Sequence, residues 1–167
     1  MSGVSACYVF TFKEGILSAV AHDLKIRVTK FDIQIEGESS VRATLDARSL
    51  RVECARRGDS DDVRALSEDD KRSIEETVAR EILKAREYPE IRFASTSVER
   101  EGGGYRVRGE LTLCGVTRSI AFVSRPLGDG QVAEATIHQP DFGIRPYRAM
   151  LGTLRLSPDV RVRVEVP

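Results

Sequence analysis

The sequence predicts a mainly β protein, an antiparallel barrel with one α-helix packed against it. Three observations support this prediction. Segment 105–126 alternates apolar and polar residues on either side of a turn at Cys114-Gly115, which is typical of a long β-hairpin. Most of the remaining chain repeats this alternation, with connections short enough for antiparallel pairing. One stretch, 67–88, instead carries apolar residues at helical spacing.

The N-terminal part of the chain contains alternating runs that we interpret as strands. The first covers residues 7–13. A longer run covers residues 24–35, and its apolar residues change sides at Thr29-Lys30. A shift of one residue is what a β-bulge produces, and a bulge lets a long strand bend around a barrel. Two further runs follow, and the charged stretch 55–66, which contains a glycine, is predicted to be a mobile loop.

The stretch 67–88 has signals for both ends of a helix. Ser67 is a good N-cap residue, and the acidic residues 68–70 place negative charge at the positive end of the helix dipole. Tyr88-Pro89 ends the helix, because the residue before a proline is pushed towards extended geometry. We expect the apolar stripe of this helix to pack on the barrel, with docking to a partner as the alternative.

The C-terminal part returns to the β pattern. Residues 131–138 form a predicted strand, and the irregular segment 140–146 follows it. The last strand, 160–166, places four valines on one face and three charged residues on the other. Because so long a meander would otherwise expose its strand edges, we expect the sheet to close into a barrel.

Length and composition indicate one domain over residues 1–167. Lys+Arg and Asp+Glu are both 26, so the formal net charge is zero, which argues against a general affinity for nucleic acid. No apolar run approaches the ~20 residues of a membrane span. The N-terminus lacks the basic and apolar regions of a signal peptide, and the three cysteines are scattered. We therefore expect a cytoplasmic protein with reduced cysteines.

The sequence contains no motif typical of catalysis or metal binding. It has two histidines, no H-x-x-x-H spacing, no P-loop, no G-x-G-x-x-G and no nucleophile elbow, so we expect neither a metal nor a cofactor. His22 beside Asp23 could tune a proton donor, but neighbours on a strand point to opposite faces. A structural polar pair at a strand start is the favoured interpretation of this dipeptide.

Five segments of the chain form a specific set when they are taken in order. They are AHDL (21–24), LSEDDK (66–71), ILKAREYPEIRF (82–93), GELTLCGVTR (109–118) and DFGIRP (141–146). With these segments in this order, the chain resembles the YceI-like, polyisoprenoid-binding family over nearly its whole length.

The resemblance implies an extended lipocalin-like barrel of eight antiparallel strands with the helix packed against it. It also implies a long apolar interior, which in some members holds a polyisoprenoid such as a quinone tail or an isoprenoid alcohol. The ligand contacts of the family are diffuse lining positions, so few residues can be transferred one by one. Many relatives are exported to the periplasm, and this chain departs from them in its expected lack of a signal peptide.

The candidate site is the apolar interior and the mouth of the barrel. An eight-stranded barrel either fills with its own side chains or holds one slim ligand, and the resemblance favours the ligand. Tyr147 and Met150 could line the mouth and meet a head group, form a dimer contact or lie in a plain surface loop. The candidate ligand-binding residues are Phe10, Phe12, His22, Ile33, Leu45, Phe93, Leu111, Leu113, Ile120, Phe122, Phe142, Tyr147 and Met150.

The function that the sequence supports best is the non-catalytic binding, sequestration or transport of a long-chain apolar amphiphile, such as a polyisoprenoid or an isoprenoid quinone. Two alternatives stay open. One is a ligand-free interaction module that forms a homodimer through the helix or the final strand. The other is a small-molecule enzyme that uses His22 or Tyr147 at the barrel mouth.

Overall fold

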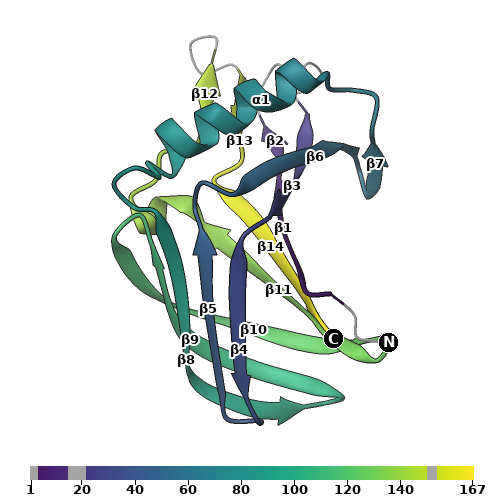
Figure 1. Cartoon of the computed structure of the whole chain (residues 1–167), viewed down its shortest axis with the longest axis vertical. Helices are drawn as coiled ribbons and strands as arrows, with labels where there is room; N and C mark the ends of the chain where they lie inside the picture. The colour runs from purple at the N-terminus through teal and green to yellow at the C-terminus, as the bar shows by residue number, and fades with distance from the viewer. Residues whose placement is uncertain (1–3, 15–21, 150–153) are drawn as a thin grey trace.

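One curled antiparallel sheet forms most of the computed structural model, which describes residues 4–14, 22–149 and 154–167 (Figure 1). Its strands are β1 (Ala6–Thr11), β3 (Asp23–Val28), β4 (Phe31–Glu36), β5 (Ser40–Asp46), β6 (Leu50–Arg57), β7 (Ser60–Asp62), β8 (Glu90–Glu101), β9 (Gly104–Leu113), β10 (Val116–Leu127), β11 (Gly130–His138) and β14 (Asp159–Val166). They pair in the order β4-β5-β8-β9-β10-β11-β14-β1-β3-β6-β7. A small second sheet pairs β12 (Arg148–Ala149), β13 (Leu154–Leu156) and β2 (Lys13–Glu14).

The central hairpin is formed by β9 and β10, as the sequence predicts. Leu113 lies opposite Val116, and the two residues between them, Cys114 and Gly115, have φ angles of 51° and 74°. Two consecutive left-handed residues make the tight turn whose twist matches that of the strands. A Cβ atom on Gly115 would also lie 2.7 Å from the ring of Tyr88, so packing requires a glycine here too.

A corner divides the long predicted strand 24–35 into β3 and β4, and it also separates β5 from β6, which the sequence predicts as two runs. Ser49 stabilises the corner, because its carbonyl accepts from the Thr29 amide at 2.9 Å and its hydroxyl accepts from the Lys30 amide at 3.1 Å. The prediction of a β-bulge at Thr29-Lys30 is therefore wrong. The register shift lies earlier, between Lys25 and Ile26 of β3.

The sheet is curled but not closed, which corrects the predicted eight-stranded barrel. The division at the corner and the short β7 bring the number of strands in this sheet to eleven. β4 and β7 lie at the two ends of the strand order, so within residues 4–14, 22–149 and 154–167 each has an edge without a partner strand. β1 pairs with β3 but not with β4, because the chain turns away from β1 at the corner.

The predicted helix begins where the capping signals place it but ends early. In α1 (Glu68–Thr77), the Ser67 hydroxyl accepts from the Asp70 amide at 3.1 Å and the Asp70 carboxylate accepts from the Ser67 amide at 2.9 Å. A π-helical turn, η1 (Val78–Ile82), follows, and Lys84 then takes a left-handed φ of 48°. The helix predicted over 67–88 is therefore too long at its C-terminal end.

Two apolar clusters attach the helix to the sheet. Ile74 of α1 packs against Leu24, Ile26 and Val52. The turn η1 packs on a larger cluster, the main core, which is the set of Ala47, Leu83, Ala85, Phe93, Val107, Leu111, Leu113, Ile137, Phe142 and Ile144. The prediction that the helix packs on the sheet is confirmed.

The stretch predicted to be a mobile loop instead forms the hairpin of β6 and β7. Gly58 makes its turn with a φ of 62°. The Lys25 ammonium lies 3.3 Å from Glu53 and 3.2 Å from Asp61, which ties this hairpin to β3. Charged residues are poor markers of a loop when they pair across strands in this way.

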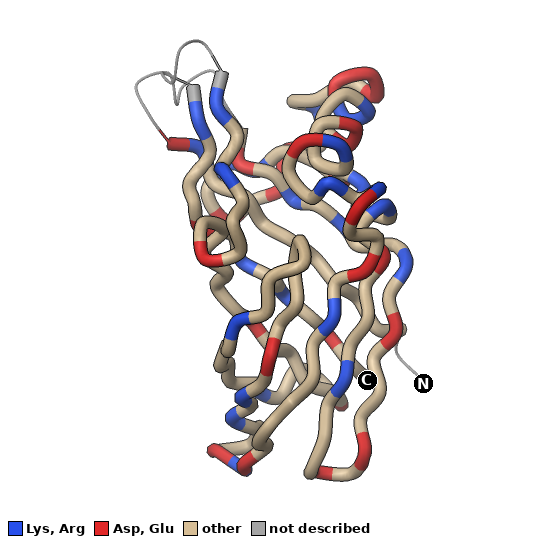
Figure 2. Tube along the Cα trace, turned by 90° about the vertical axis from the view of Figure 1, so that its left-hand side faces the viewer, with Lys and Arg blue, Asp and Glu red and all other residues tan. Residues whose placement is uncertain are grey.

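Charges of both signs are interspersed along the strands and the helix (Figure 2). Ion pairs between neighbouring strands contribute to this mixture, such as Arg163 with Glu134 at 2.8 Å. Among the described parts of the chain, no helix has the length and apolar character needed to cross a membrane.

Candidate functional site

The inner face of the sheet is the face whose side chains meet in the main core. On β14, Val160 and Val162 contact this core, so Val164 and Val166 lie on the same face by strand alternation. The β11 residue Ala133 lies opposite Val164 and therefore also faces inward. We call the space enclosed by this face the lumen. Its upper half is next to the helix, and its lower half is next to the tips of the long hairpins (Figure 1).

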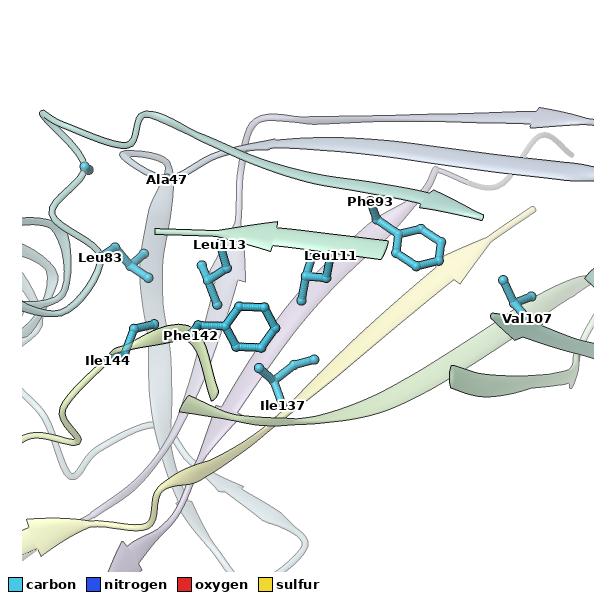
Figure 3. Packing of buried hydrophobic residues seen from close by; sticks show 10 residues of the cluster. Ala47, Leu83, Phe93, Val107, Leu111, Leu113, Ile137, Phe142 and Ile144 are labelled. Atoms are coloured by element: carbon cyan, nitrogen blue, oxygen red, sulfur yellow. The ribbon is translucent and has the colours of Figure 1, made fainter. Parts of the chain in front are cut away.

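The upper half of the lumen is filled by the protein's own side chains. Leu83, Leu113, Phe142 and Ile144 lie close together near the end of the helix, and none is more than 8% exposed (Figure 3). Val107 stands apart from them, towards the hairpin tips (Figure 3). This half therefore agrees with the alternative in which the barrel interior is packed solid.

The lower half of the lumen is lined by apolar side chains, and water still reaches several of them. β14 is a central strand, because β11 and β1 pair with its two edges. Its inner residues Val162, Val164 and Val166 are nevertheless only half-buried. A central strand can expose its inner side chains only through its face, so they lack the close packing of a protein interior. Other half-buried apolar residues of the inner face are Val98, Phe122 and Ala133.

A wedge-shaped cleft lies between the start of β1 and the free edge of β4, with a volume of about 620 Å³. We call it the wedge. Phe31 and Ile33 of β4 lie opposite Leu45 and Ala43, on the inner face, so the wall of the wedge includes the edge of this face. An open sheet with a cleft at its free edge thus takes the place of the predicted closed tunnel. The residues that line the wedge are Val4, Ser5, Arg27, Val28, Thr29, Phe31, Asp32 and Ile33.

Hydrogen bonds tie the hairpin tips together at the lower end of the lumen. The Ser124 hydroxyl donates to Oε1 of Gln131 at 3.0 Å. The Glu38 carboxylate accepts from Nε of Arg100 at 3.0 Å and from the Tyr105 hydroxyl at 3.1 Å. The hydrogen bonds from Arg100 and then Tyr105 lower the pKa of the Glu38 carboxyl, so this contact is charged at neutral pH.

Eight of the predicted site residues lie on the inner face or in the main core. The buried ones are Phe93, Leu111, Leu113 and Phe142. The half-buried ones are Ile33, Leu45, Ile120 and Phe122. The rings of Phe93 and Phe122 contact each other with centroids 5.5 Å apart, where the filled half gives way to the open half. Ligand contact by these residues stays a prediction.

Phe10 and Phe12 lie on the outer side of the sheet, so the prediction that they line the interior is wrong. Phe10 is opposite Arg161, which faces away from the inward valines of β14. The Arg56 guanidinium lies 4.8 Å from the centroid of the Phe10 ring, and the Arg161 guanidinium lies 5.3 Å from that of Phe12. These cation–π contacts cover the rings, which lets aromatic residues occupy an outer face.

His22 and Tyr147, two of the residues predicted at the barrel mouth, do not line the wedge. His22 is exposed just before β3, and Tyr147 is 38% exposed just before β12. Met150 lies outside the described residues. The Asp23 carboxylate accepts from the Lys13 amide at 2.7 Å, which confirms a structural role for this side chain at the strand start.

Sequence reasoning missed the water-accessible part of the inner face, although the sequence carries a signal for it. Val162 lies opposite Ala135, and Val164 lies opposite Ala133. A valine side chain paired with an alanine side chain has little volume. These two pairs therefore cannot fill the middle of a barrel as phenylalanine and leucine side chains do. The wedge has no comparable signal, because it forms from residues far apart in the sequence.

The three cysteines are structural side chains of the fold. Cys7 and Cys54 are buried and Cys114 is half-buried, and all three are free thiols. Burial raises the pKa of Cys7 to about 12, and it also raises the pKa of Cys54 and of Cys114. Within the residues that the structure describes, no three His, Cys, Asp or Glu side chains form a group that could hold a metal.

The raised pKa predicts that Cys7 is unreactive in the folded protein. At about pH 9 roughly one Cys7 thiol in a thousand is ionised, against about half of an exposed thiol, and only the thiolate attacks a disulfide reagent. We expect Ellman's reagent to modify Cys7 only after unfolding in urea, with peptide mass mapping to identify the residue. Rapid modification of Cys7 in the native protein would contradict its burial.

The chain belongs to the YceI-like domain family, whose model matches residues 7–167. A UPF0312 protein of Photorhabdus laumondii is 29% identical over 145 residues, which cover 81% of this chain and 66% of that protein. Protein YceI of Escherichia coli is 30% identical over 95 residues, which cover 51% of this chain and 48% of that protein. The chain therefore spans less than two thirds of the length of these relatives.

Solved structures share the fold. BcnA of Burkholderia cenocepacia has a TM-score of 0.67 at 16% identity, over 97% of this chain and 94% of that one. A polyisoprenoid binding domain from Saccharophagus degradans has a TM-score of 0.61 at 12% identity, over 99% of this chain and 96% of that one. At these identities the likeness concerns the fold alone.

Proposed function

We propose that this protein binds a long-chain apolar amphiphile, such as a polyisoprenoid, in the lower half of the lumen. The observation that carries the proposal is the half-buried row Val162, Val164 and Val166 on a central strand. Membership of the YceI-like family and the fold shared with a polyisoprenoid binding domain support it. Sequestration or transport would follow from such binding.

The dimensions and chemistry of the inner face suit a slender apolar chain. The eight residues of β14 span about 27 Å, enough for several isoprene units. Each methylene group that leaves water contributes about 0.8 kcal/mol. A prenyl chain could therefore bind tightly through apolar contact alone, with its polar head left near water.

We propose that this binding is not accompanied by catalysis. Ser124 and Tyr105, two hydroxyl-bearing residues at the lower end, already donate hydrogen bonds to Gln131 and Glu38. His22, named in the enzyme alternative, is exposed and does not line the wedge. The cytoplasmic location and the homodimer stay predictions.

A charge placed on the inner face tests the proposal. Native mass spectrometry after incubation with geranylgeraniol is expected to show a one-to-one complex with the natural sequence. We expect Val164→Glu to abolish the complex, because a carboxylate in the lumen must be desolvated by the bound chain. The matched control is Val123→Glu, since Val123 is 42% exposed on the outer face.

The two variants also separate binding from folding. Circular dichroism should show that both retain the β spectrum of the natural sequence. Equal geranylgeraniol binding by Val164→Glu and Val123→Glu would place the ligand elsewhere. No binding by the natural sequence would overturn the proposed function.

A further inference from the structure

The register of β1 with β3 can be continued onto β4 when one extra residue is placed at the corner. Tyr8 is opposite Arg27, so the next inward pair in this register is Cys7 with Val28. Beyond the corner at 29–30, the inner face passes to Phe31, and the inward position before Cys7, just outside β1, is Ser5. If the two strands continued to pair, Ser5 would therefore lie opposite Phe31.

The same register has a consequence for the outer face. Val4 and Asp32, the neighbours of Ser5 and Phe31, would face each other on the outside of the sheet. Two residues at the corner would then oppose Ala6 alone, which is the arrangement of a β-bulge. This pairing would join the start of β1 to β4 and close the open side of the lumen.

In the structure these residues stand apart and form the wedge. β1 begins at Ala6, and Val4 is 87% exposed. All four residues of the two expected pairs line the cleft of about 620 Å³. The edge of β4 that faces them has no partner strand. The wedge thus lies where a continued pairing of β1 with β4 would be.

The filled part of the lumen favours a path from the side. The upper half is filled by Leu113, Phe142 and their neighbours. At the lower end, Glu38 binds Arg100 and Tyr105 and so ties the turn between β4 and β5 to the neighbouring hairpin of β8 and β9. The side opening between β1 and β4 gives a long chain a path that does not cross the filled upper half.

We propose that the wedge is the lateral entrance through which the amphiphile reaches the lumen, and that pairing of Val4–Ser5 with Phe31–Asp32 closes it. The inference rests on the proposed function. Val28, Phe31 and Ile33 give the wedge an apolar wall for the tail. Ser5, Thr29 and Asp32 give it polar groups for an uncharged, hydroxyl-bearing head.

A disulfide placed by this register tests the closure. In Ser5→Cys/Phe31→Cys, the two thiols would share the inner face of directly opposed residues, within reach of a disulfide. In the control Val4→Cys/Phe31→Cys, they would point to opposite faces. We expect mild oxidation to join residues 5 and 31 and to leave the control reduced. Peptide mass mapping distinguishes the new bond from any bond to the native cysteines.

The exchange of ligand tests the entrance. The oxidised and reduced forms of Ser5→Cys/Phe31→Cys would be loaded with geranylgeraniol and mixed with its deuterated form, and native mass spectrometry would follow the replacement. We expect oxidation of the loaded protein to slow replacement about tenfold or more, and reduction with dithiothreitol to restore it.

Each outcome decides a different point. Equal cross-linking of the two double variants would overturn the proposed pairing. Cross-linking with unchanged exchange would overturn the entrance while leaving binding intact. Binding by neither the reduced variant nor the natural sequence would overturn the proposed function, and with it the entrance that depends on it.

Discussion

Replacing Phe142 with alanine is expected to lower the free energy of unfolding by about 3–5 kcal/mol, because it removes a large buried side chain and leaves a cavity. Phe142 is 3% exposed and lies among Leu113, Ile137 and Ile144 in the upper lumen (Figure 3). Urea unfolding followed by far-ultraviolet circular dichroism, with the slope checked for two-state behaviour, measures the difference.

The matched control is Phe31→Ala, because Phe31 is half-buried at the wedge and lies outside the main core. Phe31→Ala should lower the free energy of unfolding clearly less than Phe142→Ala does. Equal costs for the two substitutions would mean that the wall of the wedge is packed as tightly as the upper lumen. The division of the lumen into a filled and an open half would then be wrong.

Features decided by neighbouring residues could be predicted from the sequence. The β9–β10 hairpin was readable because Cys114-Gly115 interrupts a strict alternation of apolar and polar residues. The helix start was readable because Ser67 and Asp70 cap each other within one turn. The end of the helix could not be predicted, because the π-helical turn η1 and the left-handed Lys84 depend on packing against the core.

It was harder to predict which face of each strand points inward. The list of candidate site residues depended on that prediction. β1 carries apolar side chains on both faces, with Cys7 and Val9 on one and Tyr8 and Phe10 on the other. Larger side chains suggested that the aromatic face was inward. The pairing of Val9 with Val162 settles the opposite orientation, and only distant residues such as Arg56 explain why Phe10 is covered.

The open barrel could not be predicted from alternation either. A pattern of period two records which face is apolar but not whether two strand edges meet. Here the outcome depends on Ser49, which holds the corner at Thr29-Lys30 from nearly twenty residues away and turns β4 from β1. The number of strands and the closure of the sheet therefore depend on this corner. They do not depend on the apolar–polar pattern of any single strand.

Filling the lower lumen should weaken binding without unfolding the protein. Ala133 is half-buried on the inner face, opposite Val164 and Ser124. A phenylalanine at this position would occupy space that water reaches, so we expect the free energy of unfolding to change by less than about 1 kcal/mol. Displacing about three methylene groups of a bound prenyl chain would weaken geranylgeraniol binding roughly 50-fold.

A large loss of stability in Ala133→Phe would instead identify a solid interior, because overpacking a filled core costs about 1–3 kcal/mol. Ala121→Phe is the matched control, since Ala121 is exposed on the outer face opposite Arg108 and should change neither quantity. Urea unfolding and native mass spectrometry on the same two variants give both measurements. A strongly destabilised Ala133→Phe would mean that the half-buried valines of β14 border a packed core, and binding in the lumen would lose its physical basis.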